Sequence, residues 1–169
     1  MERTGNRCAM NIKILLADDH KIMRDSLRSL IEKQTGMQLV AEAENGRAAI
    51  KLNRKFRPDV IVMDIHMPEV SGIEATRQIV EEFPGTKVVA LSMHSDPQFV
   101  IGALKAGVSG YLLKDSDSEE LTRAIRAVAD NRLYLCPQVK GTVAEVCGKE
   151  DVPERINDFC RLIELTAAR

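Results

Sequence analysis

The amino-acid sequence predicts an α/β fold, in which a doubly wound, five-stranded parallel sheet carries helices on both faces. Five short apolar runs alternate with segments of helical length. The runs are almost continuously apolar, which is typical of strands buried on both faces of a parallel sheet. Since crossovers between parallel strands are right-handed, this alternation favours a layered sandwich. The expected strands are Ile12–Ala17, Gln38–Ala43, Asp59–Met63, Lys87–Ser92 and Ser109–Leu113.

The segments between these strands have the spacing of amphipathic helices. In the first of them the apolar residues are Ile22, Met23, Leu27, Leu30 and Ile31. Helices are expected to stop near three glycines, because glycine tolerates a positive φ, and near two prolines, which cannot continue a helix. These residues are Gly36, Gly85, Gly107, Pro58 and Pro84.

The two ends of the chain differ from this body. Residues 1–10 have the character of a tail, and the alternating pattern covers residues 11–136. Residues 137–169 are expected to form a linker with helical segments. One helical stripe there consists of Ile156, Phe159, Cys160 and Ile163, and such an apolar stripe must pack on another surface.

Composition excludes some classes of function. The chain has 169 residues, of which 44% are hydrophobic, and a formal net charge of -1. This balance gives no basic face for nucleic acid. No apolar stretch approaches the ~20 residues of a membrane span, and the N-terminus lacks the apolar core of a signal peptide. A cytoplasmic protein without a membrane partner is therefore expected.

The four cysteines carry little signal. Cys8, Cys136, Cys147 and Cys160 show neither CxxC spacing nor neighbouring histidines. We expect buried or idle thiols in a reducing compartment.

Polar residues end four of the expected strands. Asp18 and Asp19 follow the first strand, Asp64 the third and Lys114 the fifth, while Ser92 closes the fourth. Open α/β sheets bind ligands outside the carboxyl ends of their strands, so these side chains are expected to converge. Each has a simpler alternative: an aspartate can cap the next helix, the serine can be a turn hydroxyl, and the lysine a solvated charge.

Three carboxylates at one edge need a compensating charge. Two unit charges about 4 Å apart repel by roughly 4 kcal/mol at an effective dielectric constant near 20. Lys114 offsets part of this repulsion, and a divalent cation with oxygen ligands, best Mg²⁺, can offset the rest. A cation, a lysine and a hydroxyl beside a carboxylate suit phosphoryl transfer, with Asp64 as the nucleophile that becomes an acyl phosphate.

Residues 11–136 resemble the receiver domain of two-component response regulators. The resemblance depends on ILLADDH, VIVMDIHMPEVSGIEA, VVALSMHSD and GVSGYLLKD, which occur in this order at the expected separations. It implies a flavodoxin-like sheet of order 2-1-3-4-5. It also implies that Asp64 is the phosphoacceptor for a sensor histidine kinase.

The resemblance assigns further roles. Asp19 and Asp64 would bind Mg²⁺ with help from Asp18 and from the backbone carbonyl of His66. Lys114 would hold the phosphoryl group.

Two residues match the conformational switch of receivers. Ser92 would hydrogen-bond the phosphoryl group, and Tyr111 matches the switch aromatic, although it can also be only a packed strand residue. His66 and His94 match positions that border the path of the hydrolytic water, which suggests that they tune the lifetime of the phosphorylated state. The alternative for both is a solvated loop histidine.

Other positions refine the family resemblance. Pro68 and Gly72 would shape a rigid loop after the phosphoacceptor. Many receivers have a cis-proline after the lysine, but Asp115 stands here, and a cis bond before a residue other than proline costs about 3–4 kcal/mol. Lys-Asp and the downstream YLCP segment resemble the NarL/FixJ subfamily, which carries a LuxR-type helix-turn-helix. That output domain is absent from this sequence, so DNA binding by these residues themselves is not expected.

Three functions from different classes can be compared. The first is a phosphorylation-controlled switch with a transcriptional output, and the second a stand-alone receiver that serves as a phosphate shuttle or protein-interaction module. The third, a phosphatase of the haloacid dehalogenase type, needs a second aspartate where His66 stands. We therefore expect a switch rather than a turnover enzyme. A homodimer is conceivable through the fourth helix, the Tyr111 strand and the final helix, or through residues 156–163.

Overall fold

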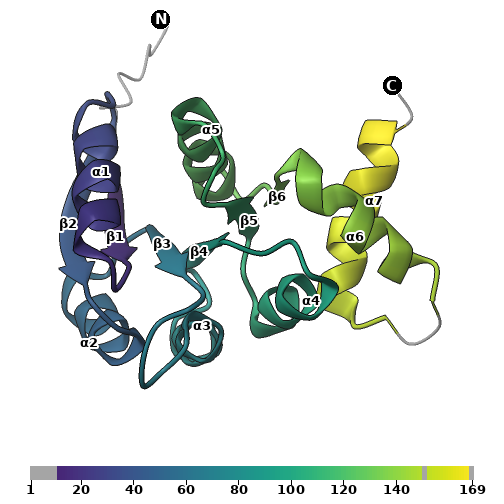
Figure 1. Ribbon diagram of the computed structural model, residues 1–169, viewed down its shortest axis with the longest axis horizontal. Coiled ribbons are helices and arrows are strands. Elements are labelled where there is room, and N and C mark those ends of the chain that lie inside the picture. The colour runs from purple at the N-terminus through teal and green to yellow at the C-terminus, as the bar shows by residue number, and fades with distance from the viewer. Residues whose placement is uncertain (1–10, 150–151, 168–169) are drawn as a thin grey trace, which may run out of the picture.

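The computed structural model describes residues 11–149 and 152–167. Residues 1–10, which were predicted to be a tail and include Cys8, lie outside the described residues. The strands are β1 (Ile12–Ala17), β2 (Met37–Ala43), β3 (Val60–Asp64), β4 (Lys87–Ser92), β5 (Gly110–Leu113) and β6 (Tyr134–Leu135). They form one parallel sheet of order β2-β1-β3-β4-β5-β6 (Figure 1). The predicted doubly wound fold and its strand order are confirmed.

The sheet has a sixth strand where five were predicted. β6 pairs with β5 over two positions, Gly110 with Tyr134 and Tyr111 with Leu135. Two residues are too few to produce a periodic pattern, which is why the alternation gave no sign of this strand.

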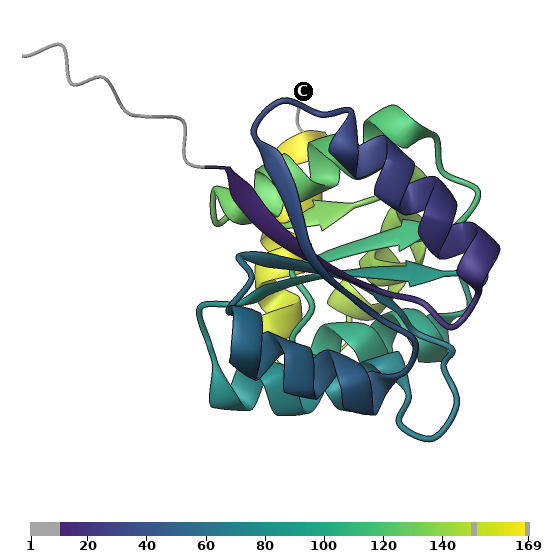
Figure 2. The ribbon, with the colours of Figure 1, turned by 90° about the vertical axis from the view of Figure 1, so that its left-hand side faces the viewer.

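Helices cover both faces of the sheet. The five helices that follow β1 to β5 are α1 (Lys21–Glu32), α2 (Gly46–Phe56), α3 (Gly72–Glu82), α4 (Pro97–Ala106) and α5 (Ser118–Ala129). α1 and α5 lie on one face and α2, α3 and α4 on the other (Figures 1 and 2). The central strands are apolar throughout because both faces are covered, and Val60–Met63 are fully buried.

Side-chain caps fix where three of these helices begin. The side chains of Asn45, Ser71 and Asp117 each accept a hydrogen bond from a backbone N–H in the first turn of α2, α3 and α5. Gly107 ends α4 with φ +108°, as predicted. Gly85 does not adopt a positive φ, so that part of the prediction is wrong, and α3 instead ends at Glu82 with Phe83 as its C-cap.

Two more helices follow the sheet and form what we call the C-terminal hairpin, α6 (Pro137–Cys147) and α7 (Glu154–Ala167). Both pack on α4, beyond the β6 edge of the sheet (Figure 1). Ile156, Phe159 and Cys160 of the predicted stripe are buried, and Ile163 packs partly buried against the core. The stripe is thus used within the chain, and its buried members cannot form a dimer face in this arrangement.

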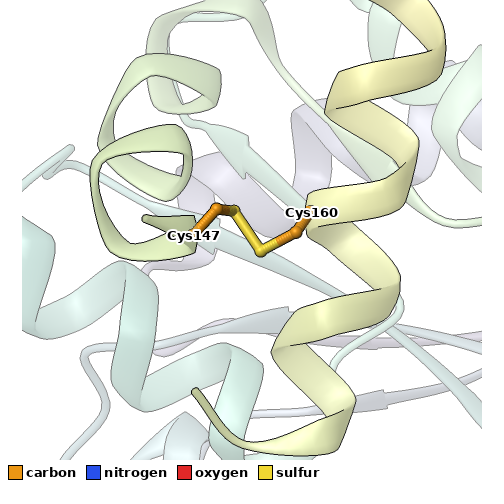
Figure 3. The surroundings of a disulfide bond; sticks show 2 residues. All are labelled: Cys147 and Cys160. Atoms are coloured by element: carbon orange, nitrogen blue, oxygen red, sulfur yellow. A yellow bond between two sulfur atoms is a disulfide. The ribbon is translucent and has the colours of Figure 1, made fainter. Parts of the chain in front are cut away.

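The hairpin corrects the expectation of idle thiols. Cys147 and Cys160 form a disulfide that joins α6 to α7 (Figure 3). Among the described residues only Cys136 is a free thiol, and it is buried. Spacing along the sequence could not reveal this pair, because the turn between two helices, and not a motif, brings the cysteines together. No helix within residues 11–149 and 152–167 is long and apolar enough to cross a membrane.

Candidate functional site

The carboxyl ends of β1, β3 and β5 bring the predicted charged residues together at one edge of the sheet, where β4 separates β3 from β5. Asp18 and Asp19 directly follow β1, Asp64 ends β3, and Lys114 directly follows β5. The Lys114 Nζ atom lies 3.2 Å from Asp18 Oδ2 and 3.1 Å from Asp64 Oδ2. The predicted convergence is therefore confirmed, at the point between β1 and β3 where the strand order reverses.

Asp64 is a buried carboxylate that lies close to a second negative charge. Its residue is 1% exposed, and one oxygen, Oδ1, accepts a hydrogen bond from His66 N–H at 3.1 Å. Burial and the nearby charge of Asp18 raise the pKa of Asp64 to about 6, although Lys114 works in the opposite direction. Because the negative charge of Asp64 is only partly neutralised by Lys114, a cation bound beside it would stabilise this carboxylate further.

Asp18 organises the loop after β1 and does not cap α1. Its Oδ1 accepts a hydrogen bond from His20 N–H at 2.8 Å, while α1 begins at Lys21 without any side-chain cap. The capping alternative therefore does not hold for either aspartate.

The acidic cluster fits a hard cation. Ligand atoms of Asp18, Asp19, His20 and Asp64 all lie within 4.8 Å of one another. Three buried oxygens, Asp18 Oδ2, Asp19 Oδ1 and Asp64 Oδ2, have no hydrogen-bond partner, because their contacts with Lys114 and His20 are ionic contacts without hydrogen-bond geometry. Carboxylate oxygens left unsatisfied in this way suit a small divalent cation that keeps several waters.

Lys114 is the permanent positive charge of the site. Its side chain is 6% exposed, and burial alone would lower its pKa, but Asp64 and Asp18 outweigh this effect and the pKa is raised. The ammonium group thus stays protonated. The peptide bonds of the described residues are all trans, including the one from Lys114 to Asp115, where the family often has a cis-proline.

Ser92 and Tyr111 both hold the same loop residue. Ser92 is buried, and its Oγ accepts a hydrogen bond from His94 N–H at 3.0 Å. Tyr111, on β5, is fully buried, and its hydroxyl donates to the His94 carbonyl at 2.8 Å. The loop from β4 to α4 is therefore tied both to the site and to the aromatic that was predicted to be the switch.

The loop after Asp64 closes tightly on the strand. Gly72 N–H donates to the Ile65 carbonyl at 2.9 Å, and a Cβ at Gly72 would collide with the Asp64 backbone. Glu69 adopts φ +66° in this loop. Gly72 is thus needed for close backbone approach, in agreement with the expectation that it shapes the loop.

A cluster of three rings borders the site. His66 lies 5.2 Å from His94 and 4.8 Å from Phe99 between ring centroids, and His94 stacks on Phe99 at 5.4 Å. Burial lowers the pKa of His66, and electrostatic interactions with His94 and Lys114 act in the same direction. The two histidines are thus exposed loop residues, as the simpler alternative has it, but each also packs its ring against Phe99.

Two residues of the site were not predicted. Arg24 is largely buried, and its Nη1 donates to the Asp18 carbonyl at 2.7 Å, so α1 fixes the loop that holds the acids. His20 contributes Nδ1, which lies 3.0 Å from Asp19 Oδ1. His20 could have been found from its place directly after two aspartates. Arg24 lies in a helical segment with several charged residues, and no sequence signal distinguishes it from them.

Comparison with known proteins agrees with this architecture. Residues 14–126 match the family described as the response regulator receiver domain. The chain is 41% identical over 128 residues to the transcriptional regulatory protein DegU of Brevibacillus brevis, which covers 76% of this chain and 54% of that relative. It is 35% identical over 133 residues to the response regulator GacA of Pseudomonas syringae pv. syringae, which covers 79% of this chain and 62% of the relative. The chain thus spans little more than half the length of these curated relatives.

Solved structures give the same answer. A two-component response regulator of the LuxR family from Aurantimonas sp. SI85-9A1 matches with a TM-score of 0.78 and 38% identity, over 82% of this chain and 99% of that one. The signal receiver domain of the putative response regulator NarL from Mycobacterium tuberculosis matches with a TM-score of 0.70 and 31% identity, over 73% of this chain and 99% of that one. With its sheet order, its acidic edge and these relatives, the chain belongs to the response regulator receiver family of two-component systems and is related to the LuxR/NarL type.

Proposed function

We propose that this chain is a phosphorylation-controlled switch in which Asp64 accepts a phosphoryl group from the phosphohistidine of a sensor kinase. The observation that carries the proposal is a buried carboxylate, Asp64, whose Oδ2 has no hydrogen-bond partner and lies 3.1 Å from a protonated lysine. In line attack by this oxygen forms a P–O bond to phosphorus and breaks the P–N bond, whose electron pair stays on the imidazole nitrogen of the kinase.

The residues around Asp64 would stabilise the transferring group. Lys114 supplies a fixed positive charge to the phosphoryl oxygens. Asp18, Asp19 and Asp64, with the His66 carbonyl as the family implies, would hold Mg²⁺. A bound divalent cation supplies further charge neutralisation at the same oxygens. We propose a switch that catalyses its own phosphorylation and dephosphorylation, and not an enzyme that turns over external substrates.

The switch would act through the loop from β4 to α4. The Ser92 hydroxyl, which accepts a hydrogen bond from His94 N–H, would donate to a phosphoryl oxygen on Asp64, and movement toward that oxygen would alter its bond with His94. Because Tyr111 donates to the carbonyl of the same residue, motion of the loop would reposition this aromatic. Phosphorylation would favour the moved state by the difference in its interactions with the two states.

We propose transcription control as the output, reached through a DNA-binding domain that is not in this sequence. Support comes from relatives named as transcriptional regulatory proteins, of which this chain spans about half. A cytoplasmic location follows from the same proposal, because sensor kinases of this kind present their phosphohistidine there. A stand-alone receiver, the alternative, would be favoured if the genomic reading frame ended at Arg169.

Phosphoryl uptake tests the proposal directly. The protein is incubated with a small acyl-phosphate donor and Mg²⁺, and its intact mass is recorded. We expect one base-labile phosphate in the wild type and none in Asp64→Ala. Asp59→Ala is the matched control. Asp59 accepts a hydrogen bond from Lys13 N–H at the opposite end of the sheet, so this variant should leave uptake unchanged. Equal labelling of wild type and Asp64→Ala would refute the assignment.

A further inference from the structure

The disulfide joins the two helices of the C-terminal hairpin to each other. Cys147 is the last residue of α6, and Cys160 lies in the middle of α7, thirteen residues later (Figure 3). Their Cα atoms are 5.6 Å apart, well within the usual span of a disulfide. The bond therefore closes the hairpin into a loop.

The hairpin covers the α4 side of the domain. Val139 and Val143 of α6 and Ile156 and Phe159 of α7 are buried in the common core. Phe159 and Leu104 of α4 line the same cavity of about 230 Å³. If the hairpin moved away, both its own apolar side chains and the surface of α4 would be exposed.

The hairpin also reaches the proposed switch loop. The Thr142 hydroxyl of α6 lies 3.5 Å from the Ser95 carbonyl, which follows the residue that Ser92 and Tyr111 hold. The guanidinium group of Arg155 in α7 lies against Gly107, so closely that a Cβ at position 107 would collide with it. Contacts at both ends of α4 thus depend on how firmly the hairpin is closed.

We infer that Cys147 and Cys160 are a reversible redox pair that locks α6 to α7, the two helices of the C-terminal hairpin that both pack on α4. This inference takes one premise from the proposed function, the cytoplasmic location. Disulfides in the cytosol are usually transient or redox-sensing. A low-molecular-weight disulfide is the oxidant: the two thiols lose two protons and two electrons, the protein S–S bond forms, and the oxidant is reduced to two thiols.

The geometry indicates how exchange begins. Cys147 is partly exposed at the end of α6, whereas Cys160 is buried. The thiol of Cys147 forms the mixed disulfide first, and Cys160 then attacks its sulfur and releases the small thiol. Reduction runs the same steps in reverse. In the reduced form the hairpin opens more often and exposes the surface of α4 that it covers.

A redox titration tests the pair. The protein is equilibrated at graded ratios of reduced to oxidised glutathione, quenched with acid, alkylated under denaturing conditions and analysed by mass. The titration uses Cys8→Ser, which leaves three cysteines, so we expect three alkylated thiols in the reducing limit and one, at Cys136, in the oxidising limit. Cys8→Ser/Cys136→Ala is the control and should lower both counts by one. Three thiols at every ratio, or one at every ratio, would overturn the proposal.

Hydrogen exchange tests the lock. Amides of α4, α6 and α7 should exchange roughly 10- to 100-fold faster in the reduced protein, since a disulfide closing a loop of this length restricts opening by about that factor. Cys147→Ser/Cys160→Ser should behave as the reduced protein in both buffers. Equal exchange of the oxidised and reduced forms would refute the lock.

A third measurement separates this inference from the proposed function. Phosphate uptake at Asp64 is recorded for the oxidised and the reduced protein. Uptake without any thiol–disulfide interconversion would leave the proposed function standing and remove the redox pair. Interconversion without uptake in either form would remove the phosphoacceptor assignment and leave the redox pair.

Discussion

At the carboxyl edge of the sheet, charged side chains are buried among apolar strands, whereas in the C-terminal hairpin apolar side chains are buried and the charges lie outside. The first region contains Asp18, Asp64 and Lys114, each nearly inaccessible to solvent. The second contains Val143, Ile156 and others that pack on α4. The two regions therefore differ in what burial does for the protein.

Burial costs free energy at the edge and supplies it in the hairpin. Removing a carboxylate from water is unfavourable unless it is fully paired. Binding of a cation at this edge of the sheet would therefore offset part of the unfavourable free energy of burial. A fully buried Val, Ile or Phe side chain contributes roughly 1.5–3 kcal/mol to folding. Substitutions in the two regions should thus affect stability and chemistry in opposite proportions.

Phe159→Ala should have the largest effect on stability. Phe159 is 2% exposed, and truncating such a side chain typically lowers the free energy of unfolding by about 3–5 kcal/mol. Urea denaturation measures this loss. Leu165→Ala, on the same helix but 71% exposed, should change it by less than about 0.5 kcal/mol. If the folded Phe159→Ala protein also lost phosphate uptake at Asp64, the hairpin and the carboxyl edge of the sheet would not act independently.

Lys114→Ala should impair phosphoryl transfer strongly, and it should also lower stability because it removes the counter-charge of two buried carboxylates. Removal of a positioned charge from a site of phosphoryl transfer should slow uptake from an acyl-phosphate donor by roughly 100- to 1000-fold. The rate is measured by the appearance of phosphoprotein at saturating Mg²⁺. Lys51→Ala, an exposed lysine of α2, is the matched control and should retain the wild-type rate. A rate within a factor of about three of wild type would contradict the role of Lys114.

Asp64→Asn should stabilise the protein when chelator removes divalent cations. The fold raises the pKa of Asp64 from 3.8 to about 6, so the folded protein holds this proton more tightly than the unfolded chain. The stability due to the protonated form is present below about pH 4 and is lost as pH rises through about 6. At pH 7.5 the variant should therefore be more stable than wild type by roughly 1–3 kcal/mol.

Denaturation at several pH values checks this sign. The difference between Asp64→Asn and wild type should shrink toward zero as pH falls from 7.5 to 4, and Mg²⁺ should also shrink it at pH 7.5. A variant that is less stable than wild type at pH 7.5 in chelator would show that Asp64 is already fully neutralised by Lys114.

The same contrast explains what the sequence could and could not predict. The limits of β1 and β4 were predicted to the residue, because their apolar runs end abruptly in polar residues. Asp18, Asp64 and Lys114 were found because charges at the ends of core strands break the burial pattern. For the hairpin, the stripe with Ile156 predicted a helix that packs, but an apolar stripe carries no information about which surface it meets.

Contacts that depend on tertiary structure were missed for related reasons. The Cys147–Cys160 bond joins two helices that both pack on α4, and neither cysteine stands in a recognisable motif. The ring of Phe99, in α4, packs against His66 and His94, and no sequence pattern indicates this contact. Such contacts arise from the directions of side chains in space, which periodicity does not specify.

The smallest effect is expected from the ring cluster beside Asp64. If His66 and His94 limit the approach of water, His66→Asn and His94→Ala should each shorten the lifetime of the phosphorylated state by roughly 3- to 10-fold, which corresponds to about 1 kcal/mol in the barrier. The measurement is loss of phosphate from purified phosphoprotein after the donor is removed. Met93→Ala, whose side chain is exposed beside His94, is the control and should leave the lifetime unchanged. Unchanged lifetimes in both histidine variants would mean that the rings only pack on Phe99, and that the burial of Asp64 itself excludes water from the phosphoryl group.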